Sequence, residues 1–283
     1  MESVAQLFPK AIKIFYGTCA YKDHQNTQVI RRTDEFNNKH NCQLPYRRLA
    51  VEHHSAEMAD AIIQIGSYAT LMTYPEYLRN KITLIHQSTT KTTIRSDSNR
   101  NTVNCNHYVY LGSVGNILRG LHYLLDYFIK HQEIELHVIG PVEEDVLEAY
   151  DNTLTPNIHL YGFLDTSTQL FHEIMTQCSF QFYISGSEGC PGSLLTCLQH
   201  GLIPIMSPWV VPDGLNCGYI LKEYAEQDIT ASVNWAKSLS TETIMEMRAA
   251  CSEYVTQNYT LERFESDFSL ALTQAIARTD NNQ

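Results

Sequence analysis

The sequence predicts an α/β protein with two parallel β-sheets of the Rossmann type, of which the N-terminal sheet is the smaller. Short apolar runs alternate with segments of helical periodicity along most of the chain, which is the pattern of successive right-handed βαβ units. The apolar runs are nearly continuous, as expected for parallel strands that helices cover on both faces. The alternation breaks once, at a polar stretch near residue 100, and this break predicts two domains.

The bulk composition is ordinary for a globular protein. The chain has 283 residues, of which 43% are hydrophobic and 18% charged, enough for two modest domains with a real core. The net charge of −11 argues against nucleic acid or an anionic membrane surface as the main partner. No apolar run reaches the roughly 20 residues of a membrane-spanning helix, and the N-terminus lacks the pattern of a signal peptide. We therefore expect a cytoplasmic protein that contacts a membrane at most peripherally.

The eight cysteines are scattered and form no C-x-x-C pair. Several lie in apolar runs, so we expect buried free thiols in a reducing compartment. The histidines also lack metal-ligand spacing, and we expect no metal site.

The first domain is expected over residues 1–104, as a reduced α/β layer. Residues 89–106 are rich in Thr, Ser and Asn without apolar periodicity, which predicts a linker or long loop. The predicted strands are 11–17, 43–49, 59–66 and 81–87, and the predicted helices are 27–40 and 67–79.

The second domain is expected over residues 105–283, where the alternation is more regular. Acidic residues open the helix at 143–152, Thr and Ser precede the helix at 166–177, and Gly201 ends the helix at 191–201, as capping preferences require. The predicted strands are 107–113, 134–141, 157–164, 179–187 and 202–208. The other predicted helices are 116–131, 228–239, 241–258 and 260–277.

Ligands of open α/β sheets bind beyond the carboxyl ends of the strands, and the end of the strand at 107–113 has an unusual composition. Gly112, Ser113 and Gly115 form a small-residue turn whose backbone amides could approach an anion. Arg119 follows at the predicted start of a helix, where the helix dipole disfavours a cation, so a phosphate partner is one interpretation. A solvent-exposed arginine is the other.

The strand end at 184–201 is the second candidate. Glu188 lies between glycines, Pro191 suits a first helical turn, and no acid competes for the amides that follow. Glu188 could accept hydrogen bonds from sugar hydroxyls, or it could be a carboxylate that only caps backbone donors. At a third strand end, Gly162 and Phe163 could border a base-binding slot, although a lone aromatic residue is more often part of a core.

Together these segments resemble the family 4 glycosyltransferases of the GT-B superfamily. The donor domain of that family begins with a strand, a glycine loop and a Lys-Gly or Arg-Gly pair, here YLGSVGNILRG. It continues with strands ending in Gly and in Gly-Phe, here ELHVIG and LYGFL. Its signature, an acid followed by Gly and later by a Gly-x-Pro strand, reads here SEGCPGSLLTCLQHGLIPI. The resemblance covers about residues 107–275.

The resemblance implies site residues at the matching positions. Glu188 would contact the donor sugar, and Arg119 would replace the usual phosphate-binding lysine. Two positions depart from the family pattern, because its second glutamate falls on Thr196 and its loop arginine falls near Val114, which puts the donor nucleotide in doubt. The residues implied in donor binding are Gly112, Ser113, Gly162, Phe163, Gly189, Gly192, Ser193, Leu194 and Thr196.

The N-terminal part resembles only the later half of the family's acceptor domain, through ADAIIQIGS and KITLIHQ. Either that domain is reduced or the chain is a piece of a larger protein. The polar residues 21–26 lie at a strand end, and we expect Lys22, His24 and Arg31 on the acceptor side, with a solvated loop as the alternative. His53, His54 and His86 could act as general acids or bases, but structural or surface histidines are expected more often.

The resemblance implies transfer of a sugar from a nucleotide-diphosphate sugar to a saccharide or glycoconjugate hydroxyl, with retention and without a cofactor. No Asp-x-Asp triplet is present to bind a metal. A helix N-terminus near Gly192 together with Arg119 would stabilise the leaving diphosphate. Two alternatives stay open. One is a degenerate, non-catalytic GT-B module that binds sugar or a partner protein, and the other is a nucleotide-sugar epimerase.

Overall fold

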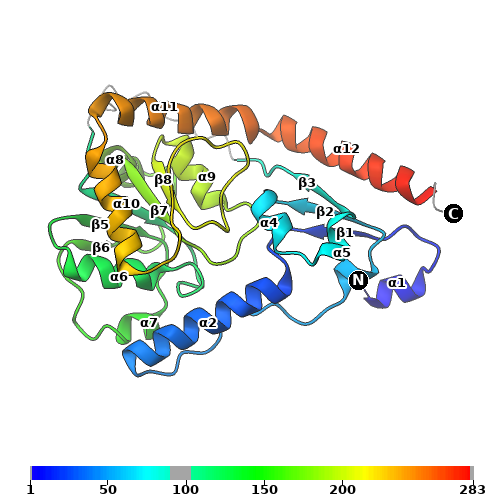
Figure 1. The fold of residues 1–283 in the computed structure, drawn as a ribbon, viewed down its shortest axis with the longest axis horizontal. Helices are drawn as coiled ribbons and strands as arrows, with labels where there is room; N and C mark the ends of the chain where they lie inside the picture. The colour runs from blue at the N-terminus through cyan, green and yellow to red at the C-terminus, as the bar shows by residue number, and fades with distance from the viewer. Residues whose placement is uncertain (1, 90–102, 281–283) are drawn as a thin grey trace.

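The computed structural model describes residues 2–89 and 103–280 and contains two parallel sheets (Figure 1). The small sheet has the order β1-β2-β3, and the large sheet has the order β6-β5-β4-β7-β8-β9, with parallel pairing throughout. The strands are β1 (Ile14–Gly17), β2 (Ala61–Ile65), β3 (Ile82–Ile85), β4 (His107–Leu111), β5 (Glu135–Ile139), β6 (Ile158–Leu160), β7 (Phe180–Tyr183), β8 (Ile203–Met206) and β9 (Tyr219–Ile220). The predicted fold class is confirmed.

Helices connect the strands and cover both sheets. The sequence of the first part gives α1 (Glu2–Leu7), α2 (Lys22–His40), α3 (Ser55–Met58), α4 (Tyr68–Met72) and α5 (Glu76–Arg79). The second part gives α6 (Leu121–Lys130), α7 (Glu144–Glu148), α8 (Gln169–Gln177), α9 (Gly192–Gln199), α10 (Glu226–Ser238), α11 (Thr241–Asn258) and α12 (Leu261–Asp280). None of the described helices is long and apolar enough to cross a membrane.

Several local predictions were wrong in their limits. Residues 43–49 form a loop rather than a strand: Pro45 interrupts the run, and the amide of Leu44 donates to the side chain of Asn37 instead of to a sheet. The helix predicted at 27–40 begins already at residue 22. The helix predicted at 67–79 is split into α4 and α5, with Pro75 before the second. Most of the predicted linker at 89–106 lies outside the described residues.

The helix predicted at 116–131 starts only at Leu121, because residues 116–120 form a turn that ends on Gly120 in the left-handed region. Arg119 therefore lies in this turn and not on the helix. Three short elements were missed altogether, namely α1, α3 and β9.

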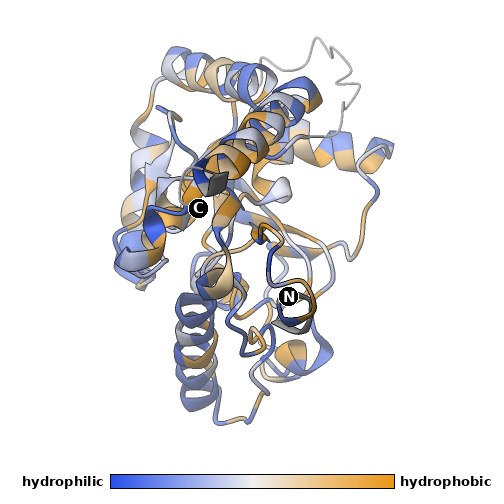
Figure 2. Cartoon of the chain, turned by 90° about the vertical axis from the view of Figure 1, so that its right-hand side faces the viewer, coloured by the Kyte–Doolittle hydropathy of each residue, from blue (hydrophilic) through white to orange (hydrophobic). Residues whose placement is uncertain are grey.

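Each sheet is covered in part by a helix from the other end of the chain. Phe36 on α2 packs into the large hydrophobic core that surrounds β4, β7 and α6. In return, α12 runs along the small sheet, where Phe264, Phe268 and Ala271 pack with Ile63 on β2 (Figure 1). Both termini consequently lie at the small-sheet end of the molecule, as the rotated view also shows (Figure 2). Below, the small lobe denotes residues 2–89, and the large lobe denotes residues 103–258.

Candidate functional site

A pocket of about 410 Å³ lies beyond the carboxyl ends of β4, β5 and β7, at the start of α9. This is the edge where an open parallel sheet binds its ligands. Its lining includes most of the residues that the sequence singled out for donor binding, and these are Gly112, Ser113, Arg119, Phe163, Glu188, Gly192, Ser193 and Thr196. The tertiary structure thus gathers three separate sequence segments into one cavity.

An ion pair forms the polar centre of this pocket. The Nη1 atom of Arg119 lies 2.6 Å from Oε1 of Glu188, and each side chain is 13% exposed. The hydroxyl of Tyr183 accepts from Arg119 at 2.9 Å and donates to Glu188 at 3.2 Å, while Ser185 donates to the same carboxylate oxygen at 3.1 Å. Burial raises the pKa of Tyr183 well above its ordinary value, so its phenol stays neutral. The pair is therefore largely shielded from solvent and held in one geometry by the two neighbouring hydroxyls.

The turn that carries Arg119 is fixed by a carboxylate that sequence reasoning missed. Glu143 accepts hydrogen bonds from the amides of Gly115 and Asn116, and its own amide donates to the side chain of Asn116 at 2.8 Å. The amide of Gly115 is thus already paired with Glu143 and not open to a ligand anion. Only Gly112 and Ser113 of the small-residue turn border the pocket. In the sequence, the only indication of this role was the position of Glu143 shortly after the strand end at Gly140 and Pro141.

The start of α9 provides backbone donors at the opposite wall. Pro191 precedes Gly192, and the amides of the first helical turn have no partner within a helix. No acidic residue lies in this turn, so the positive end of the helix dipole faces the pocket uncompensated. The side chain of Leu194 is buried in the core, so Leu194 can offer only its backbone. Thr196 lines the pocket, and its hydroxyl donates to the carbonyl of Gly192 at 2.9 Å.

Two predicted glycines do not line the cavity. Gly162 lies at an isolated bridge with Gly140, and the neighbouring Phe163 side chain is 82% exposed at the rim, not in a core. Gly189 lies where the Glu188 loop meets the small lobe. A Cβ atom there would lie 2.3 Å from the carbonyl oxygen of Thr18 and 2.7 Å from that of Ile65, so only glycine fits.

The three residues predicted on the acceptor side do not meet in one place. Lys22 lines a cavity of about 230 Å³ with Thr18, Gln25 and His53, and it pairs with Glu52. The other two predicted residues lie elsewhere, as described next.

His24 points toward the large lobe. Its Nε2 atom lies 2.9 Å from the carbonyl oxygen of Gly186, its ring packs 4.4 Å from that of Trp209, and burial lowers its pKa. Arg31 lines a third cavity, of about 480 Å³, together with Trp209 and Lys222. Of the other histidines, His53 borders the Lys22 cavity and His86 bonds to Asp267 on α12 at 2.8 Å, which is a structural contact.

Arg32 on α2 is a second residue that sequence reasoning missed. Its side chain is 0% exposed, and Nη1 donates to the carbonyls of Leu118 and Ile184 at 2.8 and 3.0 Å. The guanidinium is flanked by the rings of Tyr123 and Tyr224. Leu118 directly precedes Arg119, and Ile184 directly follows β7 in the segment that leads to Glu188. One arginine of the small lobe therefore holds both segments that carry the ion pair, and its position in an ordinary polar helix gave no hint of this.

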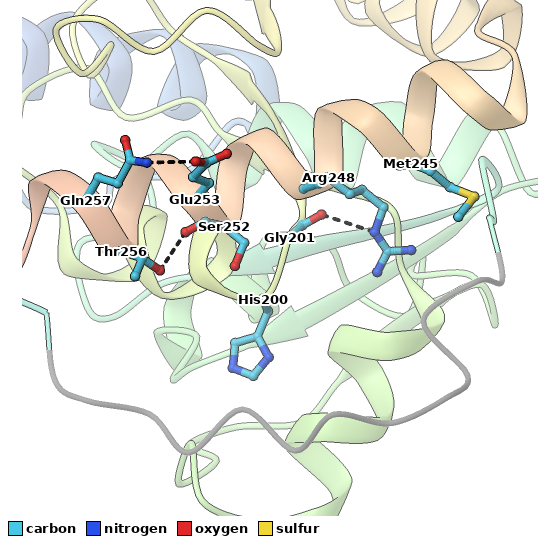
Figure 3. A pocket seen from close by; sticks show the side chains of 9 residues that line it. His200, Gly201, Met245, Arg248, Ser252, Glu253, Thr256 and Gln257 are labelled. Atoms are coloured by element: carbon cyan, nitrogen blue, oxygen red, sulfur yellow. Dashed lines mark hydrogen bonds between the residues drawn. The ribbon is translucent and has the colours of Figure 1, made fainter.

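Another cavity, of about 710 Å³, lies elsewhere, between the end of α9 and α11 (Figure 3). Arg248 on its wall donates to the carbonyl of Gly201, and Ser252, Glu253 and Thr256 line the adjacent turn of α11. None of the residues predicted for the site lies there. Within residues 2–89 and 103–280, no group of three or more His, Cys, Asp or Glu side chains is placed to hold a metal ion.

Of three comparisons with known proteins, only the search of solved structures finds matches, and these show the fold. Neither a scan against family models nor a search of curated proteins finds a match. Among solved structures, a TarM variant from S. aureus, in complex with fondaparinux, alpha-GlcNAc-glycerol and UDP, is 12% identical with a TM-score of 0.59. That match covers 77% of this chain and 45% of TarM, so the chain spans less than half of TarM.

Two further matches cover nearly the whole chain. HepE from Anabaena, in complex with UDP and glucose, is 11% identical with a TM-score of 0.66, covering 96% of this chain and 74% of HepE. The N-terminal domain of trehalose-6-phosphate phosphatase from Candida albicans is 11% identical with a TM-score of 0.61, covering 97% of this chain and 67% of that domain. Together with the two parallel sheets, these likenesses confirm the predicted fold: the chain has a GT-B-like fold with a small N-terminal sheet.

Proposed function

We propose that the chain is a glycosyltransferase that transfers a sugar, with retention, from a nucleotide-diphosphate sugar to a hydroxyl acceptor. The observation that carries the proposal is the buried Arg119–Glu188 pair beside the unpaired amides of α9, in a pocket at the ligand-binding edge of the sheet. HepE, whose fold is shared, was solved with UDP and glucose. The retained stereochemistry follows from the family resemblance of the sequence.

The pocket suits the charge that develops when a nucleotide diphosphate leaves. Negative charge grows on the diphosphate as the glycosidic bond breaks, and it is stabilised by groups already oriented toward it. The amides of Gly192, Ser193 and Leu194 and the guanidinium of Arg119 are such groups. Gly112 and Ser113 would lie under the bound diphosphate and sugar, and Thr196 and Phe163 would border the nucleoside.

Glu188 would orient the donor sugar. One of its oxygens already accepts from Arg119, Tyr183 and Ser185, which fixes the carboxylate while sugar hydroxyls donate to it. Among the residues that the structure describes, Glu188 is the only carboxylate in the lining, so this lining does not offer the pair of acids that a glycoside hydrolase requires. The arrangement therefore favours transfer from an activated donor over hydrolysis of a glycoside.

We place the acceptor on the small-lobe side, in the cavity lined by Lys22. Thr18 lies in its wall, and the carbonyl of Thr18 contacts Gly189, so this cavity is next to the loop that carries Glu188. Because Lys22 is neutralised by Glu52, the cavity suits an uncharged saccharide hydroxyl better than an anion. His24 would hold α2 against Gly186 of the large lobe. Arg31 would line the third cavity.

One observation favours a non-catalytic sugar-binding module as a second candidate. The charge of Arg119 is already balanced by Glu188, and the position of the family's loop arginine is occupied by Val114, which is half exposed. A phosphate would therefore meet little net positive charge. The likeness to a domain of a phosphatase also shows that this fold occurs outside transferases.

A thermal-shift screen of UDP-, GDP-, ADP- and dTDP-sugars tests the proposal. A donor at 100 times its Kd should stabilise the protein by about 2.7 kcal/mol, which is readily seen as a higher Tm. We expect one nucleotide to raise the Tm of the wild type, with a smaller shift or none for Arg119→Ala. Arg263→Ala, an exposed arginine on α12, is the matched control and should keep the full shift.

Turnover then separates the two candidates. With the donor identified, we expect slow hydrolysis of the donor or transfer to added saccharides, measured as nucleotide diphosphate release, and loss of that release in Glu188→Gln. Donor binding without release would favour the module. The absence of a shift with all four donors, or a full shift in Arg119→Ala, would contradict the proposed site.

A further inference from the structure

Two thiols lie against each other beside the candidate site. The Sγ atoms of Cys217 and Cys251 are 2.9 Å apart, although 34 residues separate them in sequence. Cys217 lies in the loop before β9, and Cys251 lies in the middle of α11. All eight cysteines are free thiols, as predicted, but the prediction that they are buried holds only for Cys178, Cys197 and Cys251. No other cysteine pair in the described part of the chain makes such a contact.

The two thiols have different environments. Cys251 is buried in an apolar cluster that also contains Leu194 and Tyr183 of the pocket region. Cys217 is only partly buried, at the edge of that cluster. The hydrogen bond from Cys251 lowers the pKa of Cys217 and raises that of Cys251, so Cys217 ionises first.

We propose that Cys217 and Cys251 form an oxidisable dithiol, a modification site that a small disulfide such as oxidised glutathione converts into an intramolecular disulfide. The Cys217 thiolate attacks the small disulfide, forms a mixed disulfide and releases one glutathione thiolate. The Cys251 thiolate then attacks the Cys217 sulfur, forms the internal bond and releases the second glutathione. The two cysteines lose two protons and two electrons, and one glutathione disulfide is reduced to two glutathione thiols.

The bond would fix a loop of the large lobe that also contacts the small lobe. Residues 207–218, here called the strap, connect β8 to β9 and reach the small lobe through Asp213, whose carboxylate accepts from the amide of Tyr68 at 3.0 Å. The carbonyl of Asp213 also accepts from Tyr254 on α11 at 2.6 Å. A disulfide from Cys217 to Cys251 would tie the strap to α11 covalently, one helical turn from Tyr254. The bond lies within the large lobe, and it would fix the strap in the position from which Asp213 contacts Tyr68 of the small lobe.

Oxidation followed by peptide mapping tests the proposal directly. The full chain is equilibrated with oxidised and reduced glutathione, remaining thiols are blocked with N-ethylmaleimide, and the protein is digested with pepsin at acidic pH, where disulfides do not exchange. We expect mass spectrometry to find Cys217 joined to Cys251, with reversal by reductant. We also expect oxidation to raise the Tm by about 5–10 °C, because the bond closes a long loop in the unfolded chain.

Matched variants keep the result interpretable. Cys190→Ser removes a neighbouring cysteine of the same cluster and should leave the crosslink and the Tm rise intact. Cys217→Ser, the less buried change, should abolish both while the reduced protein remains folded. Three results with the wild-type protein would contradict the proposal. They are a crosslink of Cys217 or Cys251 to another cysteine, a stable glutathione adduct that does not proceed to the internal disulfide, and full alkylation of both thiols in oxidising buffer.

Discussion

The two lobes bury their sheets in different ways. In the large sheet, β7 and β8 are buried along their whole length, and helices of the same lobe cover both faces. In the small sheet only the central strand β2 is fully buried, and Tyr16 on the edge strand β1 is 43% exposed. The large sheet thus builds its own core, whereas three short strands leave one face to be covered by α12 from the far end of the chain.

This difference teaches that the lobes are not independent. A small sheet buries too little apolar surface to be stable without help. Helix α12 covers the small sheet. Helix α2 of the small lobe in turn packs against the large lobe, where its Phe36 and Arg32 are buried. Since Arg32 holds the segments of Arg119 and Glu188, the smaller lobe also supports the candidate site. Two changes test this dependence and a third probes the large lobe alone, in order from the largest expected effect to the smallest.

The largest effect is expected for Arg32→Met, which keeps the volume but removes the guanidinium. The buried carbonyls of Leu118 and Ile184 would lose their donor, and the rings of Tyr123 and Tyr224 would lose the cation between them. We expect a loss of about 2–4 kcal/mol in the free energy of unfolding, measured by urea denaturation. Arg31→Met, on the exposed side of the same helix, should change it by less than about 0.5 kcal/mol. Equal stability of the two variants would show that the free-energy cost of burying the Arg32 guanidinium offsets the gain from its hydrogen bonds.

A smaller and local effect is expected for Phe268→Ala on α12. Its ring packs with Phe264 and the small-sheet cluster, so we expect a loss of about 1–3 kcal/mol. The sharper measurement is hydrogen exchange, which should speed up at the amides of β2 and β3 while those of β7 keep their protection. Leu270→Ala, at a position 58% exposed on the same helix, is the control. Equal acceleration in both sheets would mean that the two lobes unfold as one unit.

The smallest effect concerns pH and acts on the large lobe. His137 on β5 is stacked between His107 and His159 and bonded to Tyr161. Burial, with the charges of the two neighbouring histidines, lowers its pKa to about 4, below the value of about 6.5 in the unfolded chain. The unfolded state therefore binds the proton more readily, and stability falls as the pH drops from 6.5 toward 4.

His137→Phe keeps the stacked ring without titrating. We expect its unfolding free energy to fall by about 2 kcal/mol less than that of the wild type between pH 7 and pH 5. His172→Gln on α8, outside the histidine stack, should follow the wild type. Parallel pH profiles of the wild type and His137→Phe would exclude this histidine as the acid-sensitive point of the large sheet.

Sequence reasoning located the strands of the large sheet well, because buried parallel strands are unbroken apolar runs whose helices carry clear caps. It failed at residues 43–49, where a short apolar run looks the same in a strand and in a loop until a partner strand is present. It also placed Arg119 on a helix, because the turn at 116–120 depends on Glu143, whose carboxylate arrives from the next strand end.

The sequence by itself determined the α/β class, the parallel strand arrangement, the reduced first sheet and the segments of Arg119, Glu188 and the α9 start. These features are local: they follow from periodicity, glycine spacing and capping within a few residues. Only the tertiary structure decided that Arg119 pairs with Glu188, that Arg32 holds both of their segments, that Cys217 meets Cys251, and that α12 completes the small sheet. These contacts join residues tens to hundreds of positions apart, and the packing of whole elements, not any local preference, brings them together.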